Sequence, residues 1–209
     1  PVQYVIRPDL TYGGFAGQIA SGVVRTGDEV VALPSMKRSR VVSIDTFEGP
    51  IPEAVSPMSV SLRLADEIDV SRGDMLVHPS DLPLVSDSFE AMLVWLNERP
   101  LDPERSYLLK HTTQLVRARI EKVHAATDLE SLEPRGATAL SLNDIGRVSL
   151  RTQRPVFYDP YTKNRSTGAF VLIELNTVLI GLGFTQALIQ AALGIIIVAL
   201  VSLYGREPH

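Results

Sequence analysis

Four side chains that could do chemistry lie close together in the sequence: Asp159, Tyr161, Asn164 and Arg165. A carboxylate, a phenol, an amide and a guanidinium can together bind a polar ligand, and His111 would add a group that exchanges protons near neutral pH. Asp and Asn also form turns, because their side chains accept hydrogen bonds from nearby backbone amides. The stretch is therefore either a polar ligand pocket or a well-made turn, and its spacing alone favours the turn.

Two β-branched, apolar runs flank these residues, Arg147 to Leu150 before them and Ala169 to Ile173 after them. Such runs predict strands, and the Pro, Asp, Asn and Gly between them predict a specified turn. Groups held between strand ends by a rigid sheet are often binding groups. The sequence therefore places these four side chains on a loop of a β-domain.

A second set of charged residues precedes the apolar run Met75–Val77. Closely spaced carboxylates can hold a metal ion or serve in acid and base catalysis. This set does not have the spacing of a calcium-binding loop, and acids that line a turn are more often solvated. We therefore predict no catalytic residue and no metal ligand here. The set comprises Asp66, Glu67, Asp69, Arg72 and Asp74.

The composition excludes several classes of function. The 209 residues contain no cysteine, which removes disulfides, thiolate metal sites and cysteine nucleophiles. The four histidines are scattered, which makes a zinc site improbable. The formal net charge of −4 and a pI near 5.6 give no global positive field, so we predict no nucleic-acid partner.

Apolar runs separated by turn residues continue along the whole chain. A strand is predicted from Phe15 to Val24, and the runs around Thr26-Gly27-Asp28 predict a hairpin. A small basic cluster precedes the predicted strand Val41 to Phe47 and contains Lys37, Arg38 and Arg40. The proline-rich segment His78 to Pro83 is typical of a linker, so a domain boundary is expected near residues 79–86.

The long segment Tyr107 to Lys122 alternates apolar and charged residues with a period of two. This alternation favours strands over a helix. Arg117 and Arg119 then lie on one face. They either form an ordinary solvent-exposed face or meet an acidic partner.

Several of these motifs together resemble a known family. They are Tyr107-Leu108-Leu109-Lys110-His111-Thr112-Thr113, Leu142-Asn143-Asp144-Ile145-Gly146-Arg147-Val148, and Asp159 and Tyr161 followed by Asn164-Arg165-Ser166-Thr167-Gly168-Ala169-Phe170. The set resembles the C-terminal half of the large, GTPase subunit of bacterial sulfate adenylyltransferase. Residues 12–27 and 66–74 look like the middle barrel of the same family, which is related to domain 2 of elongation factor Tu. The likeness extends from about Pro1 to Ile173.

The resemblance implies a mainly β fold made of two tandem antiparallel β-barrels. The first, over residues 1–82, is expected to be similar to domain 2 of the translation factor. The second, over residues 83–180, is expected to be similar to its domain 3. An apolar, helical tail is expected over residues 181–209. The sequence begins at Pro1 without an initiator Met, which suggests that the chain is an internal piece of a longer protein.

The family's nucleotide-binding motifs do not occur in this sequence. A Gly-x-x-x-x-Gly-Lys-Ser/Thr loop and an Asn-Lys-x-Asp base reader hold GTP in related proteins. The glycines at 13, 14 and 17 lie between strands and have no such lysine. The chain alone is therefore expected neither to bind nor to hydrolyse GTP, and to contain no cofactor, with GTP and Mg²⁺ belonging to a GTPase domain outside it.

By resemblance, the chain is the non-catalytic barrel portion that couples a GTPase to a small adenylyltransferase subunit in the cytoplasm, as part of a heterodimer. The small subunit makes adenylyl sulfate from ATP and sulfate during sulfate assimilation. Expected contacts with the GTPase domain or the partner subunit come from three loops. Their residues are Gly13, Gly14, Asp66, Glu67, Asp69, Arg72, Asp74, Asp159, Tyr161, Asn164 and Arg165. The alternative is a stand-alone enzyme or ligand-binding barrel with a pocket around Asp159–Arg165.

The resemblance weakens after Ile173. Glu174 stands where the family has Asp, no Arg follows, and Asn176-Thr177-Val178 is a remnant of the family's last turn. Residues 175–205 carry no charge, and this length exceeds the ~20 apolar residues that span a bilayer. Gln186 and Gln190 weigh against a membrane helix. A membrane contact is thus expected only through this tail, which otherwise covers a barrel or a partner.

Overall fold

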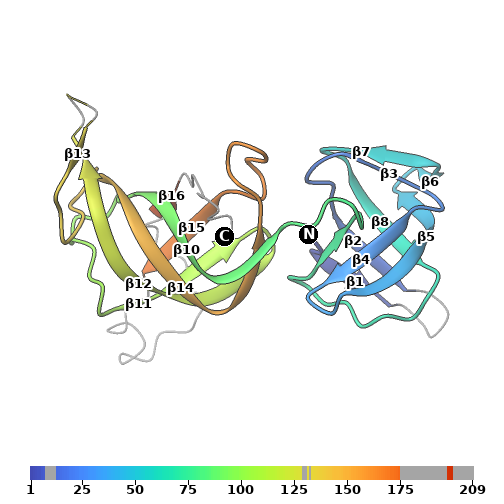
Figure 1. Ribbon diagram of the computed structural model, residues 1–209. Coiled ribbons are helices and arrows are strands. Elements are labelled where there is room, and N and C mark those ends of the chain that lie inside the picture. Colours follow the sequence, from blue (N-terminus) through green and yellow to red (C-terminus); the bar gives the residue numbers. More distant parts are fainter. Residues whose placement is uncertain (8–12, 129–130, 132, 175–196, 200–209) are drawn as a thin grey trace. The chain divides into compact units, whose positions relative to one another are not determined.

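The structure is a computed structural model and describes residues 1–7, 13–128, 131, 133–174 and 197–199. Within these ranges every regular element is a β-strand, as predicted (Figure 1). The chain divides into two compact units. The N-terminal unit contains residues 1–84 and 112–114, and the C-terminal unit contains residues 85–111 and 115–209.

The N-terminal unit is built from nine short strands. Six of them are neighbours in a seven-stranded sheet, in the order β1-β2-β8-β5-β4-β9, and β6 pairs with β5 as its seventh strand. β3 and β7 pair with each other in a separate two-stranded sheet. The strands are β1 (Tyr4–Ile6), β2 (Gly14–Gln18), β3 (Val23–Arg25), β4 (Glu29–Leu33), β5 (Lys37–Thr46), β6 (Gly49–Ile51), β7 (Glu53–Val55), β8 (Ser59–Leu64) and β9 (Met75–Val77).

The strand predicted from Phe15 to Val24 is two strands in the structure. β2 ends at Gln18 and β3 begins at Val23, because the chain turns between them at Gly22, whose φ is 70°. Glycine adopts this left-handed conformation without a steric penalty. The hairpin predicted around Thr26-Gly27-Asp28 is wrong, because β3 pairs with β7 while β4 pairs with β5 and β9. Only the turn, with Gly27 at a φ of 95°, is as predicted. The basic cluster at Lys37, Arg38 and Arg40 also differs from the prediction, because it forms the first part of β5 and does not precede it.

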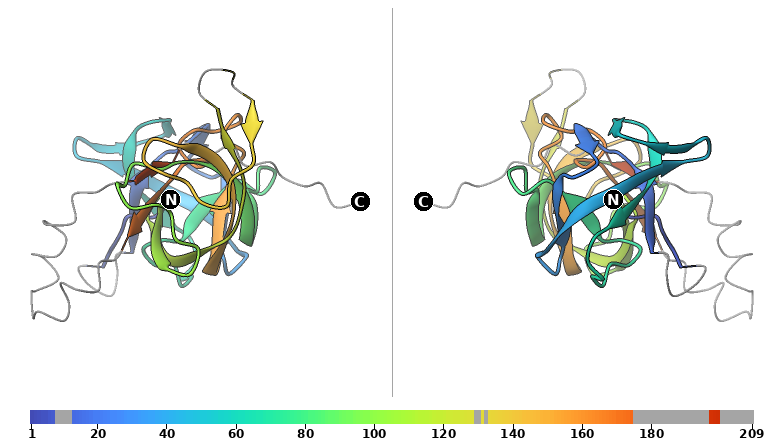
Figure 2. Two further views of the ribbon diagram at one scale, coloured as in Figure 1. Left: turned by 90° about the vertical axis from the view of Figure 1, so that its left-hand side faces the viewer. Right: turned by 90° about the vertical axis from the view of Figure 1, so that its right-hand side faces the viewer.

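The C-terminal unit has longer strands and one large core. Its seven-stranded sheet has the order β10-β14-β12-β11-β15-β16, and β13 pairs with β12 as the seventh strand. The strands curve around that core, as the left view of Figure 2 shows. They are β10 (Leu84–Val94), β11 (Ser106–His111), β12 (Gln114–Thr127), β13 (Pro134–Arg135), β14 (Ile145–Tyr158), β15 (Phe170–Glu174) and β16 (Ile197–Ala199).

The segment predicted as strands between Tyr107 and Lys122 forms β11 and β12, with a tight turn at Thr112 and Thr113. The alternation predicted for it is confirmed. Val116, Ala118 and Ile120 are buried, and the residues between them are exposed. Antiparallel pairing then sets Ile120 opposite Leu150 of β14, which is also fully buried. The residues of one row therefore form the core, and those of the other row form the outer surface.

Two tandem antiparallel β-barrels, as expected, make up the described fold. Of the predicted helical tail, residues 197–199 form strand β16, which pairs with β15, and the rest lies outside the described residues. The described ranges contain no helix long and apolar enough to cross a membrane. The possible membrane contact through residues 175–205 therefore falls almost entirely outside them.

Two glycines of the C-terminal unit give a matched test of the packing. A Cβ atom on Gly146 would lie 2.4 Å from Leu140 Cδ2 and 2.8 Å from the Ala125 carbonyl oxygen. Gly146→Ala should lower the free energy of unfolding by roughly 1–3 kcal/mol, because the backbone oxygen cannot move aside cheaply. Urea denaturation followed by Trp95 fluorescence measures this change.

Gly136→Ala is the control, because Gly136 is exposed and a Cβ atom there would meet no atom within 4 Å. It should be neutral or slightly stabilising, because alanine has fewer unfolded conformations than glycine. Equal effects of the two substitutions would contradict the packing of Gly146 against β12.

Candidate functional site

The loop between β14 and β15 contains the four predicted site residues, and Asp159 closes it. One oxygen of Asp159, Oδ1, lies 3.1 Å from Lys163 Nζ, and the other, Oδ2, accepts a hydrogen bond of 2.8 Å from the Thr167 hydroxyl. The Asp159 side chain is only 14% exposed. Both of its oxygens are thus engaged with residues of the same loop.

Asn164 also holds this loop together. Its Oδ1 atom accepts hydrogen bonds from the backbone N–H groups of Ser166 at 2.9 Å and Thr167 at 3.4 Å. The backbone carbonyl of Asn164 accepts a further bond from the N–H of Gly168 at 2.8 Å. A Cβ atom on Gly168 would lie 2.5 Å from Tyr161 Cα, so this tight turn requires glycine.

Tyr161 and Arg165 lie on the outside of the loop. The guanidinium carbon of Arg165 is 5.8 Å from the centre of the Tyr161 ring, a cation–π contact. Arg165 is exposed and Tyr161 is half-buried. These two side chains therefore offer an aromatic face and a positive charge at the surface.

His111 anchors the loop from β11. Its Nε2 atom lies 2.8 Å from the Thr167 carbonyl oxygen. Because a carbonyl oxygen can only accept, Nε2 carries the hydrogen and donates the hydrogen bond. His111 is 97% buried, and burial lowers the pKa of its imidazole. Together with the contacts of Asp159 and Asn164, this arrangement supports the well-made turn over the ligand pocket.

Two carboxylates of the acidic segment in the N-terminal unit likewise accept hydrogen bonds from nearby serines. The Oδ2 atom of Asp66 accepts a hydrogen bond of 2.8 Å from the hydroxyl of buried Ser39, and Asp74 Oδ2 accepts one of 2.7 Å from the Ser71 N–H. The side chains of Glu67, Asp69 and Arg72 are exposed around buried Ile68 and Val70. No group of three His, Asp or Glu within the described ranges is arranged to hold a metal ion.

Gly13 and Gly14, which are predicted to contact another domain, lie at the start of β2 in the sheet of the N-terminal unit. Gly14 begins β2 and pairs with Ile6 and Arg63, and exposed Gly13 comes directly before it. The structure assigns the third glycine a packing role, because a Cβ atom on Gly17 would lie 2.3 Å from the Pro1 carbonyl oxygen. Whether Gly13 and Gly14 contact another domain stays a prediction.

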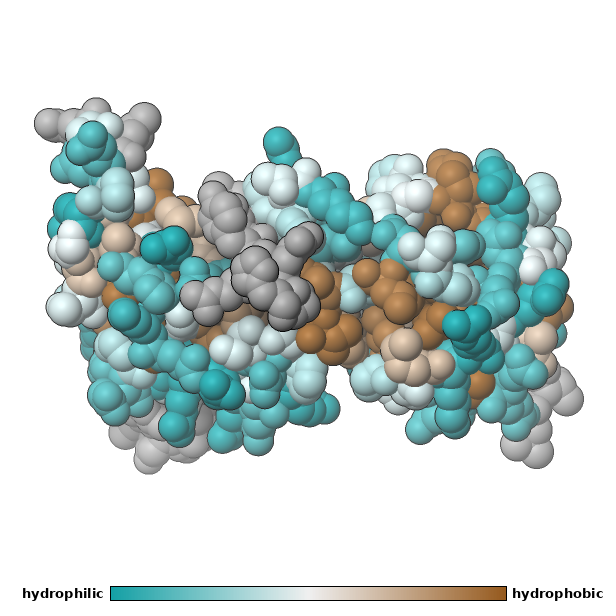
Figure 3. Space-filling model, viewed as in Figure 1, coloured by the Kyte–Doolittle hydropathy of each residue, from teal (hydrophilic) through white to brown (hydrophobic). Residues whose placement is uncertain are grey.

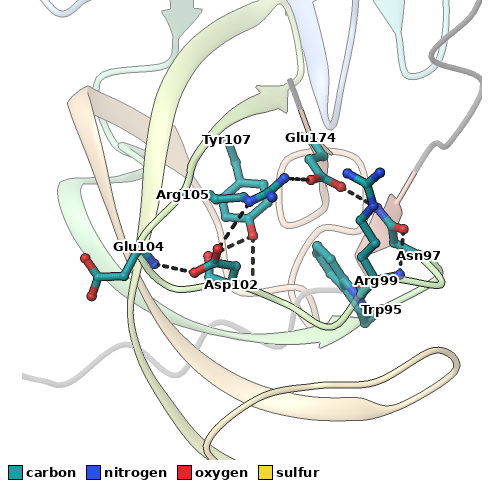
Figure 4. Close-up of polar contacts among 8 residues, drawn as sticks. All are labelled: Trp95, Asn97, Arg99, Asp102, Glu104, Arg105, Tyr107 and Glu174. Atoms are coloured by element: carbon teal, nitrogen blue, oxygen red, sulfur yellow. Dashed lines mark hydrogen bonds and ion pairs between the residues drawn. The ribbon is translucent and has the colours of Figure 1, made fainter. Parts of the chain in front are cut away.

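A polar network that the sequence did not reveal lies at the end of β15 (Figure 4). The carboxylate of Glu174 accepts hydrogen bonds from Asn97 Nδ2 and from Arg105 Nη1. Arg105 Nε also donates to Asp102 Oδ2 at 3.2 Å. Asn97 is 96% buried, and its Oδ1 atom accepts a bond of 3.0 Å from the Arg99 N–H. The network joins the segment between β10 and β11 to β15.

Two aromatic side chains donate hydrogen bonds to backbone carbonyls of the same segment. Trp95 Nε1 donates to the Arg99 carbonyl oxygen at 2.7 Å, and the Tyr107 hydroxyl donates to the Asp102 carbonyl oxygen at 2.9 Å. The two rings meet edge to face with centres 6.0 Å apart. Burial raises the pKa of Tyr107 to about 12, so its hydroxyl stays protonated and remains a donor.

The arrangement of strands identifies the class of protein. The fold matches the crystal structure of sup35 complexed with GDP, with a TM-score of 0.79 and 17% identity, over 100% of this chain and 47% of that one. The family model for GTP-eEF1A C-terminal domain-like sequences matches residues 88–186. The two units are therefore β-domains of the kind found in elongation-factor-like GTPases.

Sequence comparison narrows this class to one family. The chain is 52% identical over 174 residues to sulfate adenylyltransferase subunit 1 of Bacteroides fragilis, covering 83% of the chain and 37% of that relative. It is 49% identical over 183 residues to the bifunctional enzyme CysN/CysC of Mycobacterium tuberculosis, covering 85% of the chain and 30% of that relative. The chain belongs to the family of sulfate adenylyltransferase large subunits. It spans about two fifths or less of the length of these relatives.

Asn97 offers a test of the polar network. Asn97→Ala should lower the free energy of unfolding by roughly 1–3 kcal/mol, because it leaves the Arg99 N–H and a Glu174 oxygen without their partner. Urea denaturation measures the loss. Glu104→Ala is the control, because its exposed side chain is outside the network and only its backbone N–H bonds to Asp102. If both variants were as stable as the parent, the network would not hold this segment.

Proposed function

We propose that this chain is the non-catalytic β-barrel portion of a GTP-dependent sulfate adenylyltransferase large subunit. In this role it couples the conformational change of a GTPase domain to adenylyl sulfate synthesis by a small subunit in the cytoplasm, as part of sulfate assimilation. The observation that carries the proposal is an identity of about one half to proteins of that name, over more than four fifths of the chain.

The contacts of the polar residues support a scaffolding role. Asp159, Asn164 and His111 all bond within or onto one loop, and Asp66 and Asp74 bond to nearby serines. Side chains used in this way hold their loops in a fixed conformation. A rigid scaffold with specified loops suits a part that transmits position between two other domains.

The exposed side chains of the same loops are the proposed contacts. Tyr161 and Arg165 belong to the residue types that most often carry binding energy at protein interfaces. Glu67, Asp69 and Arg72 are exposed on the N-terminal unit. We assign these two loops, with Gly13 and Gly14, to contacts with the GTPase domain and the small adenylyltransferase subunit.

Binding to the small subunit tests the proposal. The full chain should form a complex with the small adenylyltransferase subunit of its own organism, measured by analytical ultracentrifugation. The double variant Tyr161→Ala/Arg165→Ala should weaken that complex at least about tenfold, because it removes an aromatic anchor and its cation. Thr162→Ala is the control in the same loop, since Thr162 is exposed and lies between the two contact residues in the sequence. Absence of any complex with the parent chain would refute the proposal.

Nucleotide binding gives an independent test. No heat of binding should be seen when GTP and Mg²⁺ are titrated into the full chain, because its sequence lacks a phosphate-binding loop. A GTPase-containing large subunit serves as the positive control in the same calorimeter. Micromolar affinity of the chain for GTP would show that the barrels hold a nucleotide site of their own.

A further inference from the structure

Positive charge is concentrated on three neighbouring strands of the C-terminal unit. β11, β12 and β14 carry seven Lys and Arg residues and one acidic residue, Glu121. The chain as a whole has a formal net charge of −4, so this region has the opposite sign to the rest. The residues that carry the argument are Lys110, Arg117, Arg119, Arg151 and Arg154, here called the basic face.

The register of the sheet brings these charges together. Arg119 of β12 lies directly opposite Arg151 of β14. Both side chains are exposed, and Arg117 follows on the same outward row as Arg119, because Ala118 between them is buried. Figure 3 shows mostly hydrophilic residues over β12 and β14. Like charges directly opposite on neighbouring strands destabilise a sheet.

Of these three arginines, only Arg151 has its positive charge balanced by nearby carboxylates. Arg151 Nε pairs with Glu121, and Asp87 on the adjacent β10 adds a weaker attraction to Arg151. Among the described residues, Arg117 and Arg119 have no carboxylate partner. Arg117 and Arg119 of the basic face therefore have guanidinium groups whose five donors each are available to a ligand.

We propose that the basic face is the surface that binds an acid-rich region of the small adenylyltransferase subunit. Guanidinium groups bind carboxylates through two parallel hydrogen bonds, which gives both attraction and orientation. Two unpaired arginines that one strand holds at a fixed spacing fit such a region well. The inference takes the identity of the partner from the proposed function, and the location from the charges of the sheet.

The residues around the arginines favour a protein partner over a nucleic acid. Leu115, on the same outward row of β12, is 48% exposed and adds an apolar contact. The aromatic residues of these three strands, Tyr107, Phe157 and Tyr158, are buried, so the face has no ring on which a base could stack. The net negative charge of the chain also repels a polyanion at long range.

Charge reversal on the face provides the test. The double variant Arg117→Glu/Arg119→Glu should weaken the complex between the full chain and the small subunit by on the order of a hundredfold, measured by titration calorimetry. Arg117→Lys/Arg119→Lys keeps the charge but loses the paired geometry, and should weaken binding by about tenfold or less. The affinity of the parent chain should fall as salt is raised, because exposed charges are screened.

A control with the same change of net charge separates this surface from general electrostatics. Arg7→Glu/Lys37→Glu alters two exposed residues of the N-terminal unit and should leave binding within about twofold. Circular dichroism and urea denaturation of all variants establish that each is folded. Equal losses with the control variant and with Arg117→Glu/Arg119→Glu would overturn the inference.

The outcomes also separate this inference from the proposed function. If the parent chain did not bind the small subunit, the proposed function would fail. If the parent bound and Arg117→Glu/Arg119→Glu bound equally well, only the assignment of the face would fail. A single-stranded oligonucleotide is the remaining probe, followed by fluorescence anisotropy. Tighter binding of the oligonucleotide than of the small subunit, lost in Arg117→Glu/Arg119→Glu, would assign the face to phosphates and overturn the inference.

Discussion

The C-terminal unit depends on one apolar row shared by its two longest strands. Val116, Ala118 and Ile120 of β12 face the same core as Val148 and Leu150 of β14. Because successive side chains of a strand point to opposite faces, this row forces its alternating neighbours outward. The register therefore cannot slip by one residue without burying the arginines of β12.

That constraint also explains where the polar residues are used. Long strands need tight connections, and a tight connection leaves backbone N–H groups without partners. Asn164 supplies such partners in the turn between β14 and β15, where Asp159 also accepts a hydrogen bond from the Thr167 hydroxyl and His111 donates one to the Thr167 carbonyl. At the end of β15, Glu174 accepts a hydrogen bond from the Asn97 side chain. Residue types that can do chemistry elsewhere here stabilise loops.

The surface of the C-terminal unit then divides into two kinds of feature. The Tyr161 and Arg165 pair is a small aromatic and cationic projection on a loop. The basic face is broader, and its strands hold the side chains at fixed spacing. Loops and sheet faces of this kind are complementary, since the one gives local specificity and the other gives electrostatic attraction.

The sequence by itself determined the β class, the turn at Gly27 and the alternation of β12, because these follow from periodicity and from turn residues acting over a few positions. It was wrong about the hairpin there, because the strands on either side of this turn pair with other strands. Its motifs also placed the chain in its family. At Asp159–Arg165 it favoured a turn but left a ligand pocket open, since Asp and Asn occur in both. Only the tertiary structure decided this, by bringing His111 to Thr167 across 56 positions. The tertiary structure alone also joined Glu174 to Asn97, and set Arg119 opposite Arg151, because contacts between distant segments depend on strand register and leave no local pattern in the chain.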